Sequence, residues 1–136
     1  KENFFAYVDF SFFGSKDIAY ILPKNTDYNL KYITSILNSK LIYYWLYYKG
    51  KRKGEVLELY AKPLSEIPIK QSNNQDLFVG LHDCLIKTNN KQEFEYLILK
   101  LNLMVYKLYN LAYEECKIID INIEKIFPKT FMSAWI

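Results

Sequence analysis

The sequence predicts an α+β fold, in which a small mixed sheet and one long packed helix precede a C-terminal antiparallel helical hairpin. Three observations lead to this expectation. Aromatic and β-branched residues alternate near the start of the chain, as they do in strands. Apolar residues recur at steps of three and four in residues 29–50 and again in residues 76–110, as they do in amphipathic helices. Only Asn89 and Asn90 interrupt the second stretch, and so short a linker allows only an antiparallel hairpin.

The first half of the chain contains the expected strands and the long helix. Phe4, Ala6, Val8 and Phe10 would share one face of the first strand, and Pro23 would end the second because proline cannot donate to a sheet ladder. In chain order, this half is expected to form a strand over residues 3–10, a strand over 18–22, a helix over 29–50 that Gly50 ends, a strand over 55–60, and an edge strand or extended segment over 67–69.

The second half is expected to be helical. Apolar stripes predict two helices, over residues 76–88 and 91–110, which form the hairpin. A further short helix is expected over residues 114–119. A polar linker, residues 71–75, separates these helices from the first half of the chain.

Length and composition predict one folded domain. A chain of 136 residues, 51% hydrophobic and 18% aromatic, can bury a core of its own and is too short for two ordinary domains. The polar linker divides this domain into an α/β recognition core, residues 1–72, and a helical hairpin with a C-terminal tail, residues 73–136. Because the chain opens on Lys1 rather than Met, we expect it to be part of a longer polypeptide.

Membrane attachment and an oxidising compartment are not expected. The longest apolar run, residues 41–48, falls far short of the roughly 20 residues that a membrane span needs. Cys84 and Cys116 are distant in sequence and lack metal-ligand spacing, which indicates two reduced thiols in an intracellular, cytoplasmic protein.

Positive charge is concentrated in the first half of the chain. Residues 1–73 contain 11 Lys and Arg against 7 Asp and Glu, a net charge of +4. Residues 74–136 contain 7 against 8, a net charge of −1. An anion-binding surface is therefore expected in the first half.

A cluster of positive charge follows the long helix. It contains the only arginine of the chain, and the two glycines that flank it would allow a close approach of the backbone to a partner. Aromatic residues on both sides favour a nucleic-acid contact, because a guanidinium can bind a phosphate or the edge of a guanine through two hydrogen bonds. A solvated surface loop is the alternative interpretation. The expected main contacts are Lys49, Lys51, Arg52 and Lys53.

Three further residues supplement this cluster. Lys62 lies beyond the next expected strand and would extend the positive surface. Ser15 and Lys16 belong to a second exposed turn, whose hydroxyl, ammonium and backbone amides suit a phosphate. The aromatic run at residues 43–45 could stack on bases, but such a run at helical spacing is more often part of a core.

Asn38 and Ser39 fall in the middle of the expected long helix, where both are poor helix formers. They would form either an exposed turn or side-chain hydrogen bonds to an adjacent loop or strand. Together with Lys40, they are expected to form a structural platform for the cationic cluster.

The sequence contains no evident catalytic motif. His82, the only histidine, is expected to be a partly exposed helix residue, without partners for a triad or a metal site. The fragment Glu115-Cys116-Lys117 matches the acidic-x-lysine pattern of metal-dependent nucleases, but it lies in a helical context and lacks an upstream aspartate element. Four glycines are too few for a phosphate-binding loop. We therefore expect neither catalytic residues nor a metal site in this chain.

Several segments resemble one family of DNA-reading domains. Leu37-Asn38-Ser39-Lys40-Leu41 is similar to a helix of the TaqI-type C-terminal specificity domains. These domains follow the catalytic domain of adenine-specific DNA methyltransferases, and they also occur in single-chain type IIG restriction–modification enzymes, which act as type IIS enzymes. The resembling segments are residues 32–41, 50–54, 57–60, 62–69 and 105–111.

The resemblance implies a bacterial target recognition domain. Such a domain clamps double-stranded DNA against the catalytic domain of the same chain and reads part of the recognition sequence, while the catalytic domain flips and methylates adenine. S-adenosylmethionine and magnesium would bind outside this fragment, as would any endonuclease site. The DNA contacts expected from the sequence are Lys49, Lys51, Arg52 and Lys53, with Lys62, Lys16 and Ser15 in support.

Two other functions are consistent with parts of the sequence. The first is a protein-interaction module built on the helical hairpin of residues 76–110, in which the basic segment is merely solvated. The second is a small nuclease that uses Glu115 and Lys117. DNA binding that weakens with salt would separate the first function from DNA recognition, and magnesium-dependent cleavage would be required for the second.

Overall fold

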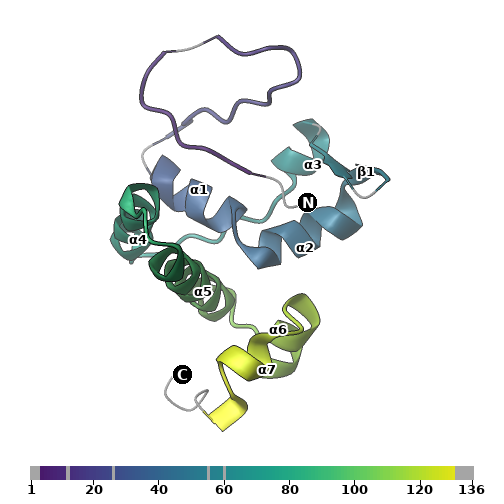
Figure 1. The fold of residues 1–136 in the computed structure, drawn as a ribbon. Coiled ribbons are helices and arrows are strands. Elements are labelled where there is room, and N and C mark those ends of the chain that lie inside the picture. The colour runs from purple at the N-terminus through teal and green to yellow at the C-terminus, as the bar shows by residue number, and fades with distance from the viewer. Residues whose placement is uncertain (1–3, 12, 26, 55, 60, 131–136) are drawn as a thin grey trace.

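The computed structural model describes residues 4–11, 13–25, 27–54, 56–59 and 61–130, with the backbone alone at residues 51, 53 and 56–58. Figure 1 shows a helical body, with the N-terminal segment looping out on one side and the C-terminal helices on the other. The described residues form the elements α1 (Leu30–Leu37), α2 (Lys40–Lys49), β1 (Lys51–Lys53), β2 (Val56–Glu58), α3 (Ala61–Ser65), α4 (Gln75–Lys87), α5 (Lys91–Leu108), α6 (Tyr113–Ile119) and α7 (Ile123–Ile126).

The predicted α+β fold class is wrong, because the regular structure of the described residues is helical apart from one short two-stranded hairpin. Its sheet consists of β1 and β2, which pair antiparallel as a hairpin. The strand expected over residues 55–60 is confirmed at its centre, as β2. The cationic segment, in contrast, was expected to be a loop and forms the other strand of this hairpin. The register places Lys51 opposite Glu58, Arg52 opposite Leu57 and Lys53 opposite Val56.

The strands predicted over residues 3–10 and 18–22 do not form among the described residues, which are neither helix nor strand from residue 4 to residue 25. A strand needs a neighbour for its backbone hydrogen bonds, and an alternating pattern does not supply one. Phe5 finds its partner in the side-chain amide of Asn38 instead. Phe4 and Phe10, which were expected to share one face of a strand, are 81% and 69% exposed.

The long helix predicted over residues 29–50 is interrupted and forms α1 and α2. Asn38 is the C-cap of α1, and Ser39 is the N-cap of α2. The Ser39 hydroxyl accepts a hydrogen bond from the N–H of Ile42 (3.3 Å) and donates one to the carbonyl of Ile36 (2.6 Å). Asn and Ser side chains compete for backbone groups in this way, which favours a cap over a continuous helix.

Two glycines set the geometry around β1. Gly50 ends α2, as predicted, and its N–H donates to the carbonyl of Leu46 (2.7 Å). A Cβ at this position would lie 2.7 Å from the same carbonyl oxygen, so a larger residue would push the chain away from the helix. Gly54, in the turn of the hairpin, has a φ of +64°, a left-handed conformation that glycine adopts without steric cost.

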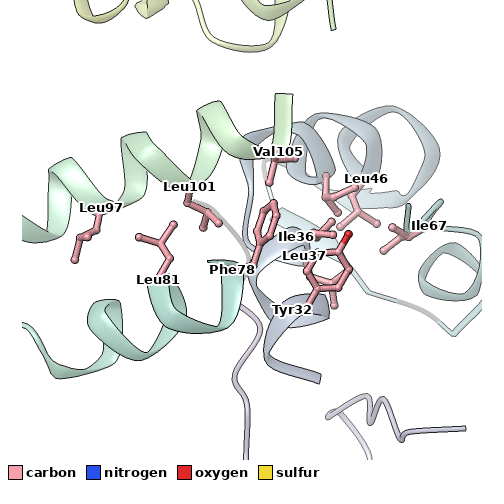
Figure 2. Close-up of a cluster of buried hydrophobic side chains, with 11 residues drawn as sticks. Tyr32, Ile36, Leu37, Leu46, Ile67, Phe78, Leu81, Leu97, Leu101 and Val105 are labelled. Atoms are coloured by element: carbon pink, nitrogen blue, oxygen red, sulfur yellow. The ribbon is translucent and has the colours of Figure 1, made fainter. Parts of the chain in front are cut away.

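The helical hairpin predicted for the second half is confirmed as α4 and α5. These helices and α1 meet in one apolar core, which also includes residues of α2 and the segment after α3, as Figure 2 shows. The rings of Tyr32 and Phe78 make an edge-to-face contact at 5.1 Å between centroids. The buried members of this core are Tyr32, Ile36, Leu37, Ile42, Leu46, Ile67, Phe78, Leu81, Leu97, Leu101 and Val105.

The C-terminal helices surround a second apolar cluster. The short helix predicted over residues 114–119 is confirmed as α6, whereas α7 was not predicted. Leu41 of α2 packs against both the main core and this second cluster, so α2 joins the two. The buried residues of the second cluster are Tyr106, Tyr113, Cys116 and Ile123.

Candidate nucleic-acid interface

Helix α2 presents four tyrosines whose rings lie close to one another. The rings of Tyr44 and Tyr48 lie 4.8 Å apart between centroids, and those of Tyr43 and Tyr47 lie 6.5 Å apart. Tyr47 and Tyr48 make an edge-to-face contact at 5.2 Å. Residues three and four positions apart share a face of a helix, so this side of α2 is an aromatic surface that ends at the hairpin.

Arg52 of β1 is held against this aromatic surface. Its guanidinium carbon lies 4.0 Å from the centroid of the Tyr47 ring, a cation–π contact, and the side chain is exposed. Stacking of this kind engages the flat face of a guanidinium and leaves its N–H donors, which lie in the plane, available. Arg52 thus contacts the Tyr47 ring and remains exposed, so its N–H donors are accessible to a partner.

The predicted DNA contacts are not all brought together. Lys49 and Arg52 lie at the junction of α2 and β1, both exposed, and neither forms an ion pair with a described residue. Lys51 and Lys53 flank Arg52 along the backbone of β1, but their side chains lie outside the described atoms. Lys62 is exposed on the neighbouring short helix α3.

Ser15 and Lys16 lie elsewhere. They belong to the N-terminal segment, which loops out beyond α1 and α4, apart from the hairpin in Figure 1. The Ser15 hydroxyl accepts a hydrogen bond from the N–H of Asp17 (3.3 Å), and the Ser15 carbonyl accepts one from Ile18 (3.1 Å). The turn expected here is present, but it does not adjoin the other cations.

Asn38 fastens the N-terminal segment to the helical body. Its Oδ1 accepts a hydrogen bond from the N–H of Phe5 (2.9 Å), and its Nδ2 donates one to the carbonyl of Phe5 (2.8 Å). The side-chain amide thus takes the place that a neighbouring strand would have. Residue 5 is held against the α1–α2 junction as a result.

Lys40 fastens α2 to the C-terminal part of the chain. Its ammonium lies 2.7 Å from Oδ2 of Asp120, whose side chain is only 6% exposed. Its backbone N–H donates to Oδ1 of Asn102 on α5 (2.8 Å). Neither Asp120 nor Asn102 was predicted from the sequence. Asn102 is a polar residue between the apolar Leu101 and Leu103, whereas nothing in the local sequence distinguishes Asp120.

His82 differs from its prediction. It is buried, at 7% exposure, rather than partly exposed, and its ring makes an edge contact with Tyr7 at 6.1 Å. The neighbouring Asp83 accepts a hydrogen bond from the ammonium of Lys31 (2.7 Å). This hydrogen bond lowers the pKa of Asp83 and raises the pKa of Lys31. The two residues join α1 to α4.

Burial raises the pKa of other groups in the core. It raises the pKa of the Cys116 thiol to about 11 and the pKa of Tyr32, whose hydroxyl donates to the carbonyl of Lys70, to about 12. Burial, together with the nearby Asp120, also raises the pKa of Tyr106. The Tyr106 hydroxyl is buried and has no hydrogen-bond partner among the described residues. These groups stay neutral and belong to the core.

The residues of the nuclease alternative are engaged within the fold. Glu115 Oε2 accepts a hydrogen bond from the N–H of Ala112 (2.7 Å) at the start of α6, and Lys117 lies 2.6 Å from Oε1 of Glu124. Within the residues that the structure describes, no three His, Cys, Asp or Glu side chains gather closely enough to hold a metal ion. No helix of that part of the chain has the length and apolar character needed to span a bilayer.

The fold and this site define a helical domain that holds an exposed arginine within a basic hairpin. Residues 1–69 match the family model of the TaqI-like C-terminal specificity domain, which confirms the resemblance found in the sequence. The chain belongs to this family.

Two curated relatives were found among type II methyltransferases. Over 73 residues the chain is 40% identical to the type II methyltransferase M.HincII of Haemophilus influenzae, and equally to the type II methyltransferase M.HindII of Haemophilus influenzae strain Rd. Each alignment covers 52% of this chain and 14% of the relative, so the chain corresponds to a small part of those enzymes. No solved structure matches the chain.

Proposed function

We propose that this chain is the DNA target recognition domain of a bacterial type II restriction–modification enzyme, and that its basic hairpin contacts double-stranded DNA. Membership of a specificity-domain family and similarity to two type II methyltransferases support the proposal. The observation that carries it is the position of Arg52, exposed and stacked on Tyr47 beside Lys49.

The geometry of Arg52 suits recognition of a base rather than general attraction to phosphate. A free arginine side chain loses rotamer entropy when it binds, whereas stacking on Tyr47 has already restricted this one. The planar guanidinium can then present two N–H groups to O6 and N7 of a guanine in the major groove. Lys49, Lys51 and Lys53 would contact phosphates on either side and set the register. Lys62 would extend these contacts.

The other functions of the enzyme would lie outside this chain. A catalytic domain of the same protein would methylate adenine, with S-adenosylmethionine bound there, and any magnesium-dependent endonuclease site would also lie outside this chain. The present chain would select the DNA sequence and hold the duplex against that domain. Such an enzyme acts on DNA in the bacterial cytoplasm.

The test is selection of preferred duplexes from a random-sequence pool by the full chain, followed by titration of the selected and scrambled duplexes. We expect binding that weakens with salt, with a log–log slope of roughly −3 to −4 for four phosphate contacts. Arg52→Ala should cost about 1–3 kcal/mol on the selected duplex and relax the preference at one base pair. Absence of salt-dependent binding to any duplex would refute the proposal.

Two variants separate recognition of a base from the attraction of DNA by positive charge alone. Arg52→Lys keeps the charge but loses the planar fork, so it should retain affinity for scrambled duplexes and lose the sequence preference. Lys100→Ala removes an exposed charge from α5 and should leave both properties unchanged. An equal loss of affinity for all sequences in Arg52→Ala would assign Arg52 to a phosphate contact only.

A second candidate function is a protein-interaction module without DNA contact, built on the α4–α5 hairpin. It is favoured by an apolar groove of about 440 Å³ that includes Phe4, Ile86 and Phe94. Ile86 is 65% exposed and Phe94 is 39% exposed. In the proposed enzyme, the catalytic domain would be the partner on this side.

Ile86→Asp should weaken association with that domain and leave DNA binding by the isolated chain unchanged. Loss of DNA binding in Ile86→Asp would contradict this division of surfaces.

A further inference from the structure

A hollow of about 360 Å³ opens beside the tyrosines of α2. Tyr43, Tyr44, Tyr47 and Tyr48 form one wall, and the segment between α6 and α7, which includes Asn122, lies opposite. These two sides come from distant parts of the sequence. The hollow therefore exists only because the C-terminal helices pack against α2.

The chemistry of this hollow is mixed. One wall consists of flat aromatic faces, and Tyr48 at its outer edge is 66% exposed. On the opposite side, the exposed side-chain amide of Asn122 makes no hydrogen bond within the described part of the chain. An amide can both donate and accept hydrogen bonds. The Lys40–Asp120 ion pair also belongs to the lining, so charged donor and acceptor groups border the hollow as well. A ligand that fits these walls has a planar π-face and a polar edge.

The hollow is continuous with the basic hairpin. Tyr47 belongs to the aromatic wall and also carries the guanidinium of Arg52 on its ring. The exposed Arg52 and the basic hairpin to which it belongs therefore place positive charges beside this wall, where an anionic backbone would be attracted. An aliphatic protein side chain would gain nothing from these charges, whereas a nucleotide joins a planar base to a phosphate.

We propose that this hollow binds one unpaired nucleobase of DNA, stacked on Tyr48 and hydrogen-bonded at its edge by Asn122, with the adjoining phosphates near the basic hairpin. The inference rests on the proposed DNA-recognition function and adds a second point of contact to it. Aromatic stacking accepts any base, because every base has a π-face. The hollow would hold a nucleotide that has left the duplex, while the hairpin reads paired sequence.

The test compares two fluorescein-labelled duplexes of identical sequence, one fully paired and one with a single unpaired nucleotide, by anisotropy with the full chain. We expect about tenfold tighter binding of the duplex with the unpaired nucleotide. Tyr48→Ala should abolish that difference and leave affinity for the paired duplex unchanged. Tyr48→Phe should retain the difference, because the ring rather than the hydroxyl carries the stacking.

Controls distinguish the ways in which the inference can fail. Tyr96→Ala, which removes a tyrosine of α5 that is 62% exposed, should preserve the difference between the duplexes. If the paired duplex is not bound at all, the proposed DNA recognition fails. If the paired duplex is bound and Arg52→Ala weakens it, yet the unpaired nucleotide adds nothing, only the present inference fails. Equal losses in Tyr48→Phe and Tyr48→Ala would show a hydroxyl contact and would also overturn it.

Discussion

The two ends of α2 both have cations, and the fold uses them differently. At its start, the Lys40 ammonium lies 2.7 Å from the carboxylate of Asp120, which is 6% exposed. At its last residue and just beyond it, Lys49 and Arg52 are exposed and have no ion pair with any described residue. Arg52 has an aromatic ring as its neighbour instead of a carboxylate.

The difference shows how burial decides what a charge does. A carboxylate taken out of water needs a cation and hydrogen bonds, so Lys40 is committed to the fold. An exposed guanidinium on an aromatic face needs no such partner and keeps its donors for a ligand. One short helix therefore joins a structural lysine to a candidate recognition arginine, and its length fixes the distance between them.

The largest effect is expected when the buried pair is broken. Lys40→Met leaves the Asp120 carboxylate buried without its cation, so the free energy of unfolding should fall by about 2–3 kcal/mol. This figure is below that of a fully buried pair because the Lys40 side chain is 38% exposed. Urea denaturation would measure it. Lys49→Met is the matched control at the other end of α2 and should change stability by less than about 0.5 kcal/mol. Equal changes in the free energy of unfolding in the two variants would show that Lys40 is no more important for stability than Lys49, and would contradict the proposed difference between the ends of α2.

A smaller effect is expected from the turn that holds Arg52 in place. Gly54→Ala forces a Cβ into a left-handed conformation at φ +64° and should lower the free energy of unfolding by about 1 kcal/mol. Gly80→Ala offers a control, because nothing lies within 4 Å of a Cβ added in the middle of α4. That variant should stabilise the protein by about 0.5–1 kcal/mol through helix propensity. Thermal unfolding of the two variants should therefore shift in opposite directions. Destabilisation by Gly80→Ala would contradict the expectation.

The smallest effect is expected from an ion pair near the surface, Lys31–Asp83. The pKa of Asp83 lies below its usual 3.8, so its contribution to stability is present above that pH and disappears as pH falls through the folded pKa. The pKa of Lys31 lies above 10.5, so its contribution is present below that pH and disappears as pH rises through the folded pKa.

Asp83→Asn should remove both contributions. The stability difference between this variant and the wild type should be present at neutral pH and shrink at each extreme, and it should stay smaller than the effect of Lys40→Met. Urea denaturation at a series of pH values would measure it. A difference that grows as the solution becomes more acidic would have the wrong sign.

The helices α4, α5 and α6 of the second half were predictable because their signals are local. The apolar stripe and the short Asn89–Asn90 linker determine the α4–α5 hairpin, and each helix can be identified from its own residues. Gly50 as the end of α2 was predictable for the same reason. The strand at residues 56–58 also followed from its local composition.

The misassigned elements depend on partners that are distant in sequence. The N-terminal alternation suggests a strand, but a strand forms only beside another, and the Phe5 backbone is paired with the Asn38 side chain. The continuous apolar pattern across Asn38 and Ser39 suggests one helix, but the hydrogen bonds of these two residues favour caps. The spacing of apolar residues shows which positions are buried. It continues across Asn38 and Ser39, so it did not reveal the interruption between α1 and α2.

The sequence by itself determined the order of the elements that matter for function: a family motif, an aromatic helix, and a basic segment bounded by glycines. Tertiary structure alone decided which of the cations were already neutralised, by bringing Asp120 to Lys40 from 80 residues away. It also set the Tyr47 ring under Arg52 and closed the tyrosine hollow with the segment between α6 and α7. The physical reason is that burial and ion pairing depend on distance in space, which a linear pattern of residues does not record.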